Sequence, residues 1–552
     1  MREYSILIGG RAGEGIRLAG LMIAKLFNQL GYRIFVYEDY PSLIKGGHNF
    51  SIIRASPKKI LAHQEKVDIL IALNQETIEQ HYWRIKKDGL IIFDSNSVKA
   101  KGIGIPLKEI TERHKLPQIA KNTAAFGAFA SILGINFSLV KKVIKNSIEK
   151  RGAENIELAK EAYQQVKKIG QFLKLSALKK SPSPLLTGNE AIALGAIKAG
   201  LKLYIAYPMT PATTILHYLA KNQENFNLLT IQPENEIAAI GLAQGASYAG
   251  IKNMIGTSGG GFALMVEHLS LAGQAEIPTV VVLSQRPGPA TGLPTYTAQG
   301  DLFFALFAGH GEFPKIVLAP GDPEEAFYLS GQALNLAWKF QVPVIILSDK
   351  HLSESTFSTE INERKIIEED FKRWKKNGEY KRYAMTADGV SPLTFPGDKK
   401  AIIKSNSYNH DEYGITTEEI EFVNKAKEKR LKKLKTIENY LKKKETIKIY
   451  GNKKSKTALI TWGSTKGVVK EVGENLNLKV IQPLYLSPLP VWELKKHLKG
   501  VKKIISVEVN TTGQLSRLLK CYGFQSDKMI LKSDGRPFTL DELEEKIKKI
   551  IL

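Results

Sequence analysis

The sequence predicts an α/β protein built from three α/β domains, and three stretches of the chain support this prediction. Each stretch runs from a short apolar strand through a turn into a helix, which is the order found in open sheets with parallel strands. The strands begin at Ile6, Leu203 and Thr457. The chain has 552 residues, and 43% of them are hydrophobic. This length and composition suffice for roughly three or four domains with cores of their own.

The first predicted domain opens with a strand at 6–8 and a helix at 16–30. The turn between them is rich in glycine, which leaves backbone N–H groups accessible at the beginning of the helix and suits an anion. A dinucleotide site would add an acidic residue about 20 positions further on, and Glu38 or Asp39 meets that requirement. The glycines of the turn are Gly10, Gly13 and Gly15. Further strands are expected at 33–37, 68–72 and 90–94.

The second predicted domain contains the most informative turn. A capping box at Thr187 and Glu190 begins a helix, and a strand follows at 203–207. The turn 207–211 has the sequence Tyr-Pro-Met-Thr-Pro. Its first proline ends the strand, and its second is expected to be the first residue of the next helix. Thr210 would then cap that helix and present its hydroxyl at the carboxyl end of a strand, where α/β sheets bind ligands.

Two later stretches of the same domain carry polar groups at predicted turns. A helix dense in alanine and glycine is expected at 234–250, with Glu234 and Glu236 near its beginning. Three glycines at 259–261 would allow a ligand or another backbone to approach closely. After the next strand comes Arg286, whose planar guanidinium suits a carboxylate.

These motifs, taken in order, resemble the α subunit of the 2-oxoacid:ferredoxin oxidoreductases, the thiamine-diphosphate and iron–sulfur enzymes that oxidise 2-oxoacids to acyl-CoA. The resemblance covers most of the chain, and ordered motifs are more specific than any one of them. The family's usual Tyr-Pro-Ile-Thr-Pro has Met209 in its third place here. The motifs lie at 207–211, 232–236, 256–261 and 286–295.

The resemblance implies a role for the polar groups near these turns. Glu236, by its register in the family's helix, would meet the aminopyrimidine of thiamine diphosphate as a catalytic acid, with Glu234 as the spare. The alternative is that both carboxylates only complement the helix dipole. Arg286, Thr295 and Thr210 would bind the substrate carboxylate beside the reactive ketone, and Thr210 is also expected to be catalytic. The residues expected to bind the cofactor are Tyr207, Pro208, Glu236, Gly259 and Gly260.

The first domain resembles another part of the same family. The segment 40–48, Tyr-Pro-Ser-Leu-Ile-Lys-Gly-Gly-His, resembles the γ subunit, a docking domain that closes over coenzyme A. The glycine turn at 10–15 would then belong to a coenzyme A or docking loop, and we favour this interpretation over a dinucleotide site. His48, beside two glycines, is expected to be structural.

The remaining chain consists of a bridging segment and a last domain that resembles the transketolase C-terminal domain, which in these enzymes supports subunit contacts. His410, Asp411 and Glu412 in the bridging segment are consecutive and cannot easily all face one ion, so no metal is expected on this chain. The predicted parts are a γ-like domain at 1–174, a linker at 175–184, a pyrimidine-binding domain for thiamine diphosphate at 185–355, a bridging segment at 356–449 and a transketolase C-terminal-like domain at 450–552.

Two absences from the sequence indicate a second subunit. Cys521 is the single cysteine, whereas an iron–sulfur cluster needs about four thiolates. The family binds the diphosphate through Mg²⁺ with a Gly-Asp-Gly and a later Asn. In the nearest match here, Ser533 stands in place of the first glycine and no Asn follows Gly535. The resemblance therefore implies a β subunit that carries the diphosphate half of the site, Mg²⁺ and the [4Fe–4S] cluster.

The formal net charge of +24 comes from 79 Lys and Arg residues against 55 Asp and Glu. The densest basic stretch, 425–448, has few aromatic residues and is expected to form an exposed linking helix with a solvated face. Docking of acidic ferredoxin is the secondary interpretation, and no nucleic acid is expected. No apolar run reaches membrane-spanning length, so the chain is expected to be soluble and cytoplasmic, without membrane contact.

The function that the resemblance implies is the CoA-dependent oxidative decarboxylation of a 2-oxoacid to acyl-CoA and CO₂. Ferredoxin would accept the electrons, and 2-oxoglutarate is slightly favoured over pyruvate as the substrate. The chain would be a γ–α fused subunit, active only with its β subunit, in a heterodimer or a dimer of heterodimers. Two alternatives stay open: a subunit of a non-redox thiamine-diphosphate enzyme, and a basic binding protein that has kept an inactive fold.

Overall fold

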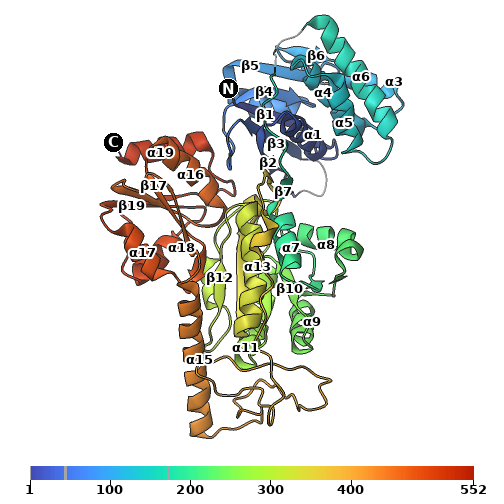
Figure 1. The fold of residues 1–552 in the computed structure, drawn as a ribbon. Helices are drawn as coiled ribbons and strands as arrows, with labels where there is room; N and C mark the ends of the chain where they lie inside the picture. The colour runs from blue at the N-terminus through green and yellow to red at the C-terminus, as the bar shows by residue number, and fades with distance from the viewer. Residues whose placement is uncertain (1, 43–46, 171–172, 174, 552) are drawn as a thin grey trace. The chain divides into compact units, whose positions relative to one another are not determined.

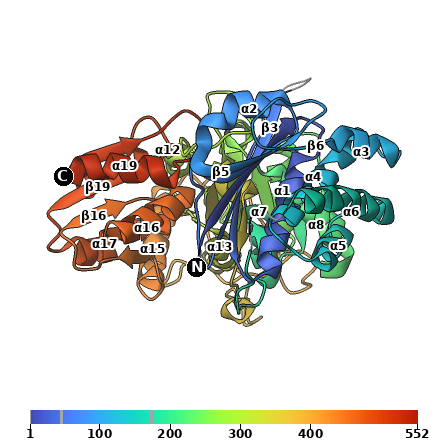
Figure 2. The same cartoon turned by 90° about the horizontal axis from the view of Figure 1, so that it is seen from above.

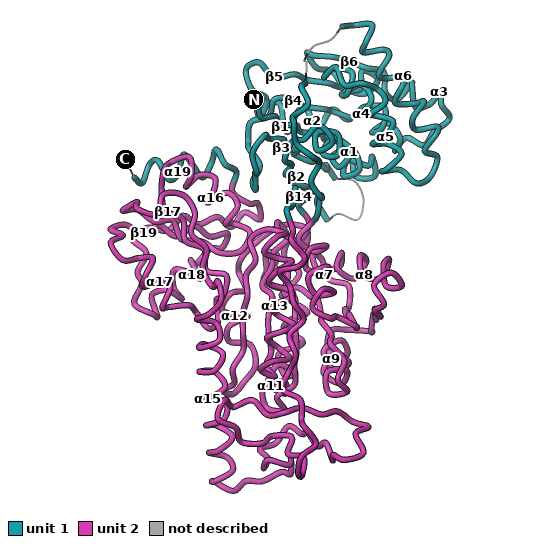
Figure 3. The backbone as a smooth tube through the Cα atoms, viewed as in Figure 1, with its two compact units in different colours: residues 1–186, 355–360, 539–552 teal, residues 187–354, 361–538 magenta. Residues whose placement is uncertain are grey.

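The computed structural model describes residues 2–42, 47–170, 173 and 175–551. Residues 43–46 of the predicted docking segment and the predicted domain limit at 174 therefore lie outside the described residues. The chain folds into two compact units (Figure 3). Residues 1–186, 355–360 and 539–552 form the first unit, and residues 187–354 and 361–538 form the second. The first unit is therefore made of three separate segments of the chain.

The first unit is built on one mixed sheet. Its strands are β1 (Tyr4–Arg11), β2 (Arg33–Asp39), β3 (His48–Ser56), β4 (Val67–Ala72), β5 (Ile85–Asp94), β6 (Ile103–Ile105), β7 (Leu185–Thr187) and β14 (Thr356–Ser358). They follow the order β6-β5-β4-β1-β3-β2-β14-β7 in the sheet. Its helices are α1 (Ile16–Gln29), α2 (Gln75–His81), α3 (Leu107–Arg113), α4 (Lys121–Ile132), α5 (Phe137–Lys145), α6 (Gly152–Ile169) and α19 (Leu540–Ile551), with 3₁₀ turns at Tyr82–Arg84 and Gln118–Ala120.

Side chains alternate between the two faces of this sheet and build a core on each. Ile6 and Ile8 of β1 pack with α1, α4, α5 and α6, which lie together on one side (Figures 1 and 2). Leu7 packs with Phe35 and Phe357 on the other side. The strands predicted at 33–37, 68–72 and 90–94 are present as β2, β4 and β5, and the helix predicted at 16–30 is α1.

The antiparallel strand β3 was not predicted, and it changes the geometry around the acidic residues. It lies between β1 and β2, so the end of β2 is not beside the strand that carries the glycine turn, as a dinucleotide site requires. Glu38 instead forms an ion pair with Arg17 (Nε to Oε2, 3.1 Å). Asp39 accepts a hydrogen bond from the Tyr37 hydroxyl (2.8 Å). The dinucleotide alternative therefore has no support in the structure.

The second unit contains a central sheet and a C-terminal sheet. The central strands are β8 (Leu203–Ile205), β9 (Leu229–Ile231), β10 (Asn253–Thr257), β11 (Thr279–Gln285), β12 (Ile316–Leu318), β13 (Pro343–Asp349) and β18 (Tyr485–Ser487). Their order is β18-β12-β13-β11-β10-β8-β9, and β18 is antiparallel to β12. The helices around them are α7 (Gly188–Lys198), α8 (Thr213–Phe226), α9 (Glu236–Tyr248), α10 (Gly259–Leu264), α11 (Val266–Gln274), α12 (Leu302–Phe307), α13 (Pro323–Phe340) and α14 (Lys350–Glu354).

Helices cover both faces of the central sheet. One core contains residues of α7, α8 and α13, and the other contains residues of α9, α10, α11 and α12. Helices α7 and α13 lie side by side (Figure 1) and approach so closely that a Cβ on Gly195 would lie 1.9 Å from the carbonyl oxygen of Phe327. Only glycine fits there. A parallel sheet covered on both faces confirms the predicted α/β fold class.

The C-terminal sheet is joined to the central sheet by a strand and by ion pairs. Its strands are β15 (Ile447–Gly451), β16 (Thr457–Ile460), β17 (Lys479–Pro483), β19 (Lys503–Glu508) and β20 (Lys528–Leu531), and its helices are α16 (Lys466–Asn475), α17 (Val491–Leu498) and α18 (Gln514–Cys521). The order is β15-β17-β16-β19-β20, and the intervening β18 joins the central sheet. Lys466 is buried and pairs with Asp322 and with Glu325 (3.0 Å) near the beginning of α13. Of the helices described, none has the length and apolar character to span a membrane.

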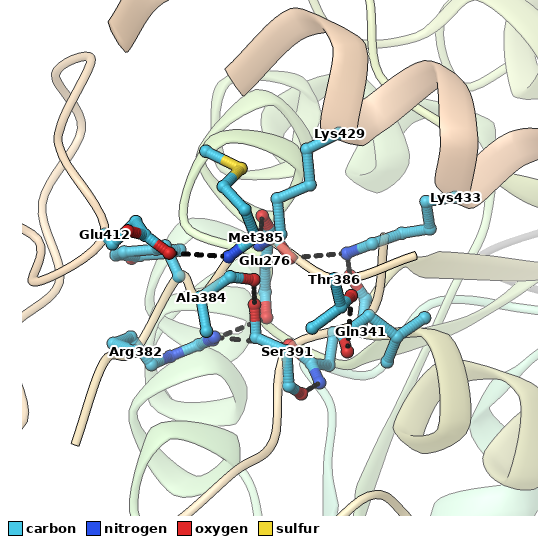
Figure 4. Close-up of polar contacts among 12 residues, drawn as sticks. Glu276, Gln341, Arg382, Ala384, Met385, Thr386, Ser391, Glu412, Lys429 and Lys433 are labelled. Carbon is cyan, nitrogen blue, oxygen red and sulfur yellow. Dashed lines mark hydrogen bonds and ion pairs between the residues drawn. The ribbon is translucent and has the colours of Figure 1, made fainter. Parts of the chain in front are cut away.

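A buried ion cluster anchors α15 (Ile420–Leu441), the helix that leads into the C-terminal sheet (Figure 4). The carboxylate of Glu276 lies 2.6 Å from Nζ of Lys429 and 2.5 Å from Nζ of Lys433, and all three side chains are buried. Arg382 of the bridging segment donates hydrogen bonds to the carbonyl oxygens of Ala275 and Glu276 (3.1 and 2.8 Å). The cluster therefore ties the bridging segment and α15 to the central domain.

The prediction of an exposed linking helix at 425–448 is wrong for one face of α15. The buried positions Ala426, Lys429, Lys433 and Ile437 recur at helical spacing. Two of them are lysines, so in the sequence this face is indistinguishable from a solvated one. The buried partner, Glu276, lies 153 residues before Lys429, too far along the chain for a local pattern to connect them.

We expect Glu276→Gln to destabilise the chain strongly, because it leaves Lys429 and Lys433 buried without a counter-charge. The cost of breaking such a pair is about 3–5 kcal/mol in the free energy of unfolding, which is measurable as a lower Tm. Glu421→Gln is the matched control, since it removes an exposed ion pair with Lys425 on the same helix and should leave Tm unchanged.

The pH dependence of the same variant has a defined sign. Burial raises the pKa of Glu276, but the charges of Lys429, Lys433 and Arg382 lower it more, so the net shift is below the ordinary 4.5. The stabilisation is therefore complete above pH 4.5 and is lost as the pH falls below it. The Tm difference between wild type and Glu276→Gln should narrow below that pH, and a constant difference would contradict an ionised Glu276.

Candidate functional site

The adjacent parallel strands β11, β10, β8 and β9 end at the same edge of the central sheet. The predicted motifs follow directly after these strands. The turn 207–211 comes after β8, Glu236 after β9, the glycines 259–261 after β10, and the segment from Arg286 to Thr295 after β11. The fold therefore brings segments that are far apart in the sequence to one edge, the usual place for a ligand in such sheets.

The turn 207–211 differs from the prediction at its end. Thr210 does not cap a helix, because the backbone N–H of Ala212 bonds to the carbonyl of Met209 (2.9 Å) and helix α8 begins only after that turn. Pro211 likewise precedes the helix. The turn is held from outside by Arg286, whose Nη1 donates to the carbonyl oxygen of Thr210 (2.7 Å). The predicted substrate-binding residues Thr210 and Arg286 are thus in direct contact.

Glu236 occupies the first turn of α9, and its carboxylate is buried. Asn235 caps the helix by accepting a hydrogen bond from the N–H of Ala238 (2.9 Å). Glu236 is 4% exposed, whereas Glu234 is an exposed residue before the helix. Oε1 of Glu236 has no hydrogen-bond partner among the described residues. A buried carboxylate oxygen in this state costs free energy unless a ligand satisfies it.

The glycines after β10 have distinct surroundings. A Cβ on Gly261 would lie 2.7 Å from Oε1 of Glu236, so this position must stay glycine for the carboxylate to fit. A Cβ on Gly259 would lie 3.0 Å from Oδ2 of Asp301, and one on Gly260 would meet no described atom within 4 Å. Gly259 and Gly260 are predicted site residues, whereas the role of Gly261, which lies directly against the acid, is visible only in the structure.

Two hydroxyl groups near this edge also lack partners. Ser258, which precedes α10, and Thr295 are both buried, and neither Oγ nor Oγ1 has a hydrogen-bond partner among the described residues. Ser258 was not predicted as a site residue. Buried polar atoms without partners among the described residues therefore lie after three adjacent strands: Glu236 after β9, Ser258 after β10 and Thr295 after β11.

Asp301 is a further residue that the sequence analysis missed. It follows the loop that begins at Arg286, and its backbone N–H donates to Oε1 of Gln285 (2.9 Å), which closes the loop. Burial raises the pKa of the Asp301 carboxyl from the ordinary 3.8 to about 6. The last predicted site residue of this loop is Thr295. Only the fold shows that the carboxylate of Asp301 lies beside Gly259.

The glycine turn of the first unit is filled by the chain itself. Glu14 accepts hydrogen bonds from the N–H of Arg11 (2.7 Å) and from Nζ of Lys121 (2.8 Å). Oε2 of Glu14 lies 2.5 Å from the position of a Cβ on Gly10. Gly13 and Gly15 have φ of 93° and 70°, which favours glycine at both. A ligand of this turn would therefore meet an acidic side chain as well as N–H groups.

The two histidine predictions have different surroundings. His48 is buried, and its Nε2 lies 2.9 Å from Nε2 of His81. His410 stacks on the ring of Tyr383 (centroids 3.6 Å apart) and contacts backbone carbonyls through both ring nitrogens.

The two acidic residues that follow His410 also have partners of their own. Asp411 accepts hydrogen bonds from backbone N–H groups of its own turn, and Glu412 pairs with Lys381 (3.0 Å). Among the described residues, no group of three or more His, Cys, Asp or Glu is arranged to hold a metal.

Two family models match this chain. One, described as "Pyruvate ferredoxin/flavodoxin oxidoreductase", matches residues 5–165, and the other, "Pyruvate flavodoxin/ferredoxin oxidoreductase, thiamine diP-bdg", matches residues 194–429. The second match spans the edge of the central sheet described above. The fold and this edge therefore define an oxidoreductase subunit of the thiamine-diphosphate class.

Similar proteins cover the whole chain. The 2-oxoacid:ferredoxin oxidoreductase subunit alpha of a Sulfolobus species is 34% identical, over 100% of this chain and 97% of the relative. The 2-oxoglutarate oxidoreductase subunit KorA of Mycobacterium tuberculosis is 27% identical, over 98% of this chain and 91% of the relative. The solved 2-oxoglutarate:ferredoxin oxidoreductase of Magnetococcus marinus, with 2-oxoglutarate, coenzyme A and succinyl-CoA bound, matches with a TM-score of 0.92 at 32% identity, over 100% of both chains. This chain belongs to the family of 2-oxoacid:ferredoxin oxidoreductase α subunits.

The family membership confirms the resemblance stated from the motifs. It also leaves the non-redox thiamine enzyme and the basic binding protein without a supporting observation.

We expect Asp301→Asn to stabilise the isolated chain at neutral pH. The wild-type carboxyl is buried with a pKa near 6, against 3.8 when unfolded, so a cost of burying its charge appears as the pH rises through this interval. That cost is roughly 1–3 kcal/mol, at about 1.4 kcal/mol per pH unit. Asparagine carries no charge at either pH. Melting curves should show a higher Tm for the variant at pH 8 and no difference at pH 4, and the reverse order would contradict a buried, uncompensated carboxylate.

Proposed function

We propose that the chain is the γ–α fused subunit of an enzyme that oxidises a 2-oxoacid to acyl-CoA and CO₂, with coenzyme A as co-substrate and ferredoxin as electron acceptor. The observation that carries this proposal is the buried Oε1 of Glu236, which has no partner among the described residues. It fits the ring nitrogen of an aminopyrimidine, because that nitrogen can share a proton with a carboxylate. When bound, thiamine diphosphate supplies a nucleophilic carbon for the ketone and an electron sink after CO₂ leaves.

The roles proposed for the residues at this edge follow from their contacts. Glu236 would share a proton with the pyrimidine and fix its tautomer, while Tyr207, Pro208, Gly259 and Gly260 would line the ring. Open space beside Gly260 supports a close ligand there. The exposed Glu234 lacks the burial that such a role requires.

Arg286, Thr295 and Thr210 are proposed to bind the substrate carboxylate. Among the described residues, Arg286 uses one of its five N–H donors, in the bond to the Thr210 carbonyl. That bond orients the guanidinium, and the remaining donors can grip a carboxylate at two points. The buried hydroxyl of Thr295, without a partner among the described residues, supplies a further donor. Thr210 would act through its hydroxyl as a catalytic group.

We propose 2-oxoglutarate, ahead of pyruvate, as the substrate. The relative from Mycobacterium tuberculosis is named for 2-oxoglutarate, and the solved protein from Magnetococcus marinus holds 2-oxoglutarate and succinyl-CoA. Pyruvate is the alternative substrate, because one of the matching family models is described as pyruvate ferredoxin/flavodoxin oxidoreductase.

An exposed apolar face beside the site supports a partner subunit. Ile237 and Leu242 of α9 and Leu264 of α10 are each nearly half exposed, and Phe307 of α12 is 73% exposed. Helices α10 and α12 pack against each other, since the ring centroids of Phe262 and Phe304 lie 5.0 Å apart, and residues of α9 belong to the same core. Exposed apolar side chains on neighbouring helices are typical of an interaction surface. We propose that a β subunit covers it and carries the diphosphate half of the site, Mg²⁺ and the [4Fe–4S] cluster.

Several finer predictions from the sequence belong to the same proposal. The first is the division of the chain into domains at 1–174, 185–355, 356–449 and 450–552. The second is the role of the glycine turn at 10–15 as a coenzyme A or docking loop. The third is a heterodimer or a dimer of heterodimers located in the cytoplasm.

Reconstitution tests the proposed function. The purified chain alone should be colourless and should not reduce a viologen dye with any 2-oxoacid, because its single cysteine, Cys521, cannot ligate a cluster. Adding the β subunit, thiamine diphosphate, Mg²⁺ and coenzyme A should produce 2-oxoacid-dependent dye reduction. A bound cluster or activity in the single chain would overturn the proposal, and so would a reconstituted complex inactive with every 2-oxoacid.

Glu236→Gln and Glu234→Gln form a matched pair for the proposed acid. Glutamine at 236 keeps the shape but cannot carry the negative charge, so turnover of the reconstituted complex should fall by about 10²–10⁴-fold. Glutamine at 234 changes an exposed side chain and should leave turnover near wild type. Size-exclusion chromatography should show both variants assembled with the β subunit. Loss of activity in Glu234→Gln alone would show that the carboxylates are assigned the wrong way round.

A further inference from the structure

The loop that carries Arg286 and Thr295 is held by residues of the central domain and by residues of the C-terminal domain. From the central domain, the hydroxyl of Thr297 donates to Oδ1 of Asp349 (3.3 Å) and accepts from the N–H of His351 (3.2 Å).

The two ends of the loop meet through Gln285, whose side chain accepts from the N–H of Asp301 (2.9 Å) and donates to the carbonyl of Ser348 (2.9 Å). Between these ends the loop contains little regular structure. Its position therefore depends on the contacts that its middle and downstream parts make.

Gln299 makes the densest set of those contacts, and they all reach the C-terminal domain. Its Nε2 donates to the carbonyl of Trp462 (2.9 Å), and its Oε1 accepts from the hydroxyl of Thr465 (2.8 Å) and the N–H of Val509 (3.1 Å). Its backbone N–H donates to the carbonyl of Val509 (2.7 Å), and its carbonyl accepts from Nδ2 of Asn510 (3.2 Å). Gln299 is 0% exposed, so these hydrogen bonds are shielded from water.

The stretch 533–536, Ser-Asp-Gly-Arg, which did not match a Mg²⁺ motif, holds the same loop. The carbonyl of Gly535 accepts from the N–H of Thr297 (2.9 Å). Gly535 has φ of 82°, and a Cβ there would lie 3.1 Å from Cβ of Tyr296, so the loop packs directly on its backbone. The guanidinium of Arg536 lies 4.4 Å from the ring centroid of Tyr296.

We propose that Gln299 is a positioning residue, through which the C-terminal domain holds Thr295 and Arg286 in place for the substrate carboxylate. Thr295 lies four residues before Gln299. Between them, the ring of Tyr296 and the backbone N–H of Thr297 contact the C-terminal domain, while the hydroxyl of Thr297 contacts the central domain. The domain thus acts on the substrate site without touching the substrate. This inference rests on the proposed function for the roles of Arg286 and Thr295, whereas the hold on the loop itself can be measured independently.

The test uses the reconstituted complex with Gln299→Leu, which keeps the size of the side chain and removes its hydrogen bonds. Hydrogen exchange of the amides at 287–298 should become faster, while α13 and the strands β16 and β19 keep wild-type exchange. kcat/KM for the 2-oxoacid should fall by about 10–100-fold through a higher KM, since small displacements of positioning groups have effects of this size. The affinity for thiamine diphosphate should be unchanged. Thr465→Val removes one bond from the C-terminal side and should give smaller changes in the same direction, even if Gln299→Leu does not fold.

Gln482→Leu is the matched control, because Gln482 is a fully buried glutamine that also joins the C-terminal and central domains. Its side chain donates to Oε2 of Glu325 (2.7 Å) and accepts from the hydroxyl of Tyr450 (2.9 Å), and neither partner belongs to the loop. It should lower Tm but leave loop exchange and KM as in wild type. Equal changes of KM in Gln299→Leu and Gln482→Leu would overturn the proposal, because the effect would then be general destabilisation.

Three further outcomes separate this inference from the proposed function. If Arg286→Lys raises KM but Gln299→Leu and Thr465→Val leave loop exchange and KM unchanged, the positioning role is overturned and the proposed function stands. If Gln299→Leu speeds loop exchange without raising KM, the C-terminal domain holds a loop that does not position substrate, which also overturns the inference. A wild-type complex inactive with every 2-oxoacid is the failure of the proposed function, and it is seen before any variant is made.

Discussion

The arrangement of the second unit depends on the buried ion pairs of Glu276. Its ion pairs with Lys429 and Lys433 fix helix α15 to the central domain, and α15 delivers the chain to the C-terminal sheet. That sheet is also held by the ion pair between Lys466 of α16 and Glu325 near the beginning of α13, and by the strand β18, which joins the central sheet. Because charges buried in this way are costly unless they are paired, the register of α15 is strongly specified. The hydrogen bonds of Gln299 to Trp462, Thr465 and Val509 add a further link between the central and C-terminal domains.

Most of the fold was predictable from local signals. The capping box of Thr187 and Glu190 is present as expected, and the strand-turn-helix stretches led to the correct fold class. Two errors have different causes, one local and one tertiary. The sequence predicts Thr210 as a helix cap, but a local turn from Met209 to Ala212 delays the helix. The lysines of α15 are predicted to form a solvated face, because their partner is remote in the sequence and a lysine carries no local mark of burial.

The candidate site was predictable in its composition but not in its geometry. The motifs predict Glu236 and Arg286 as site residues through the resemblance to the family. The structure places both directly after strands that end at one edge of the sheet. The sequence could not reveal that Glu236 is buried with an unsatisfied oxygen while Glu234 is exposed, because that difference depends on packing against Gly261. Asp301 and Gln299 were missed for a similar reason. They lie in a loop of ordinary composition, and their importance comes from contacts with Gly259 and with the C-terminal domain.

The path of the chain through the first unit has a consequence for how the protein is made. Strand β14, which pairs with β2, is synthesised only after the strands of the central sheet up to β13, and helix α19 is synthesised last. On a ribosome, where domains emerge from the N-terminus, β2 would wait with one edge unpaired until residues 356–358 appear. An open edge is prone to pair with other chains. A nascent chain that has not yet reached β14 therefore exposes the edge of β2, which β14 covers in the folded protein. Chaperones that bind nascent chains should act between the synthesis of β2 and that of β14.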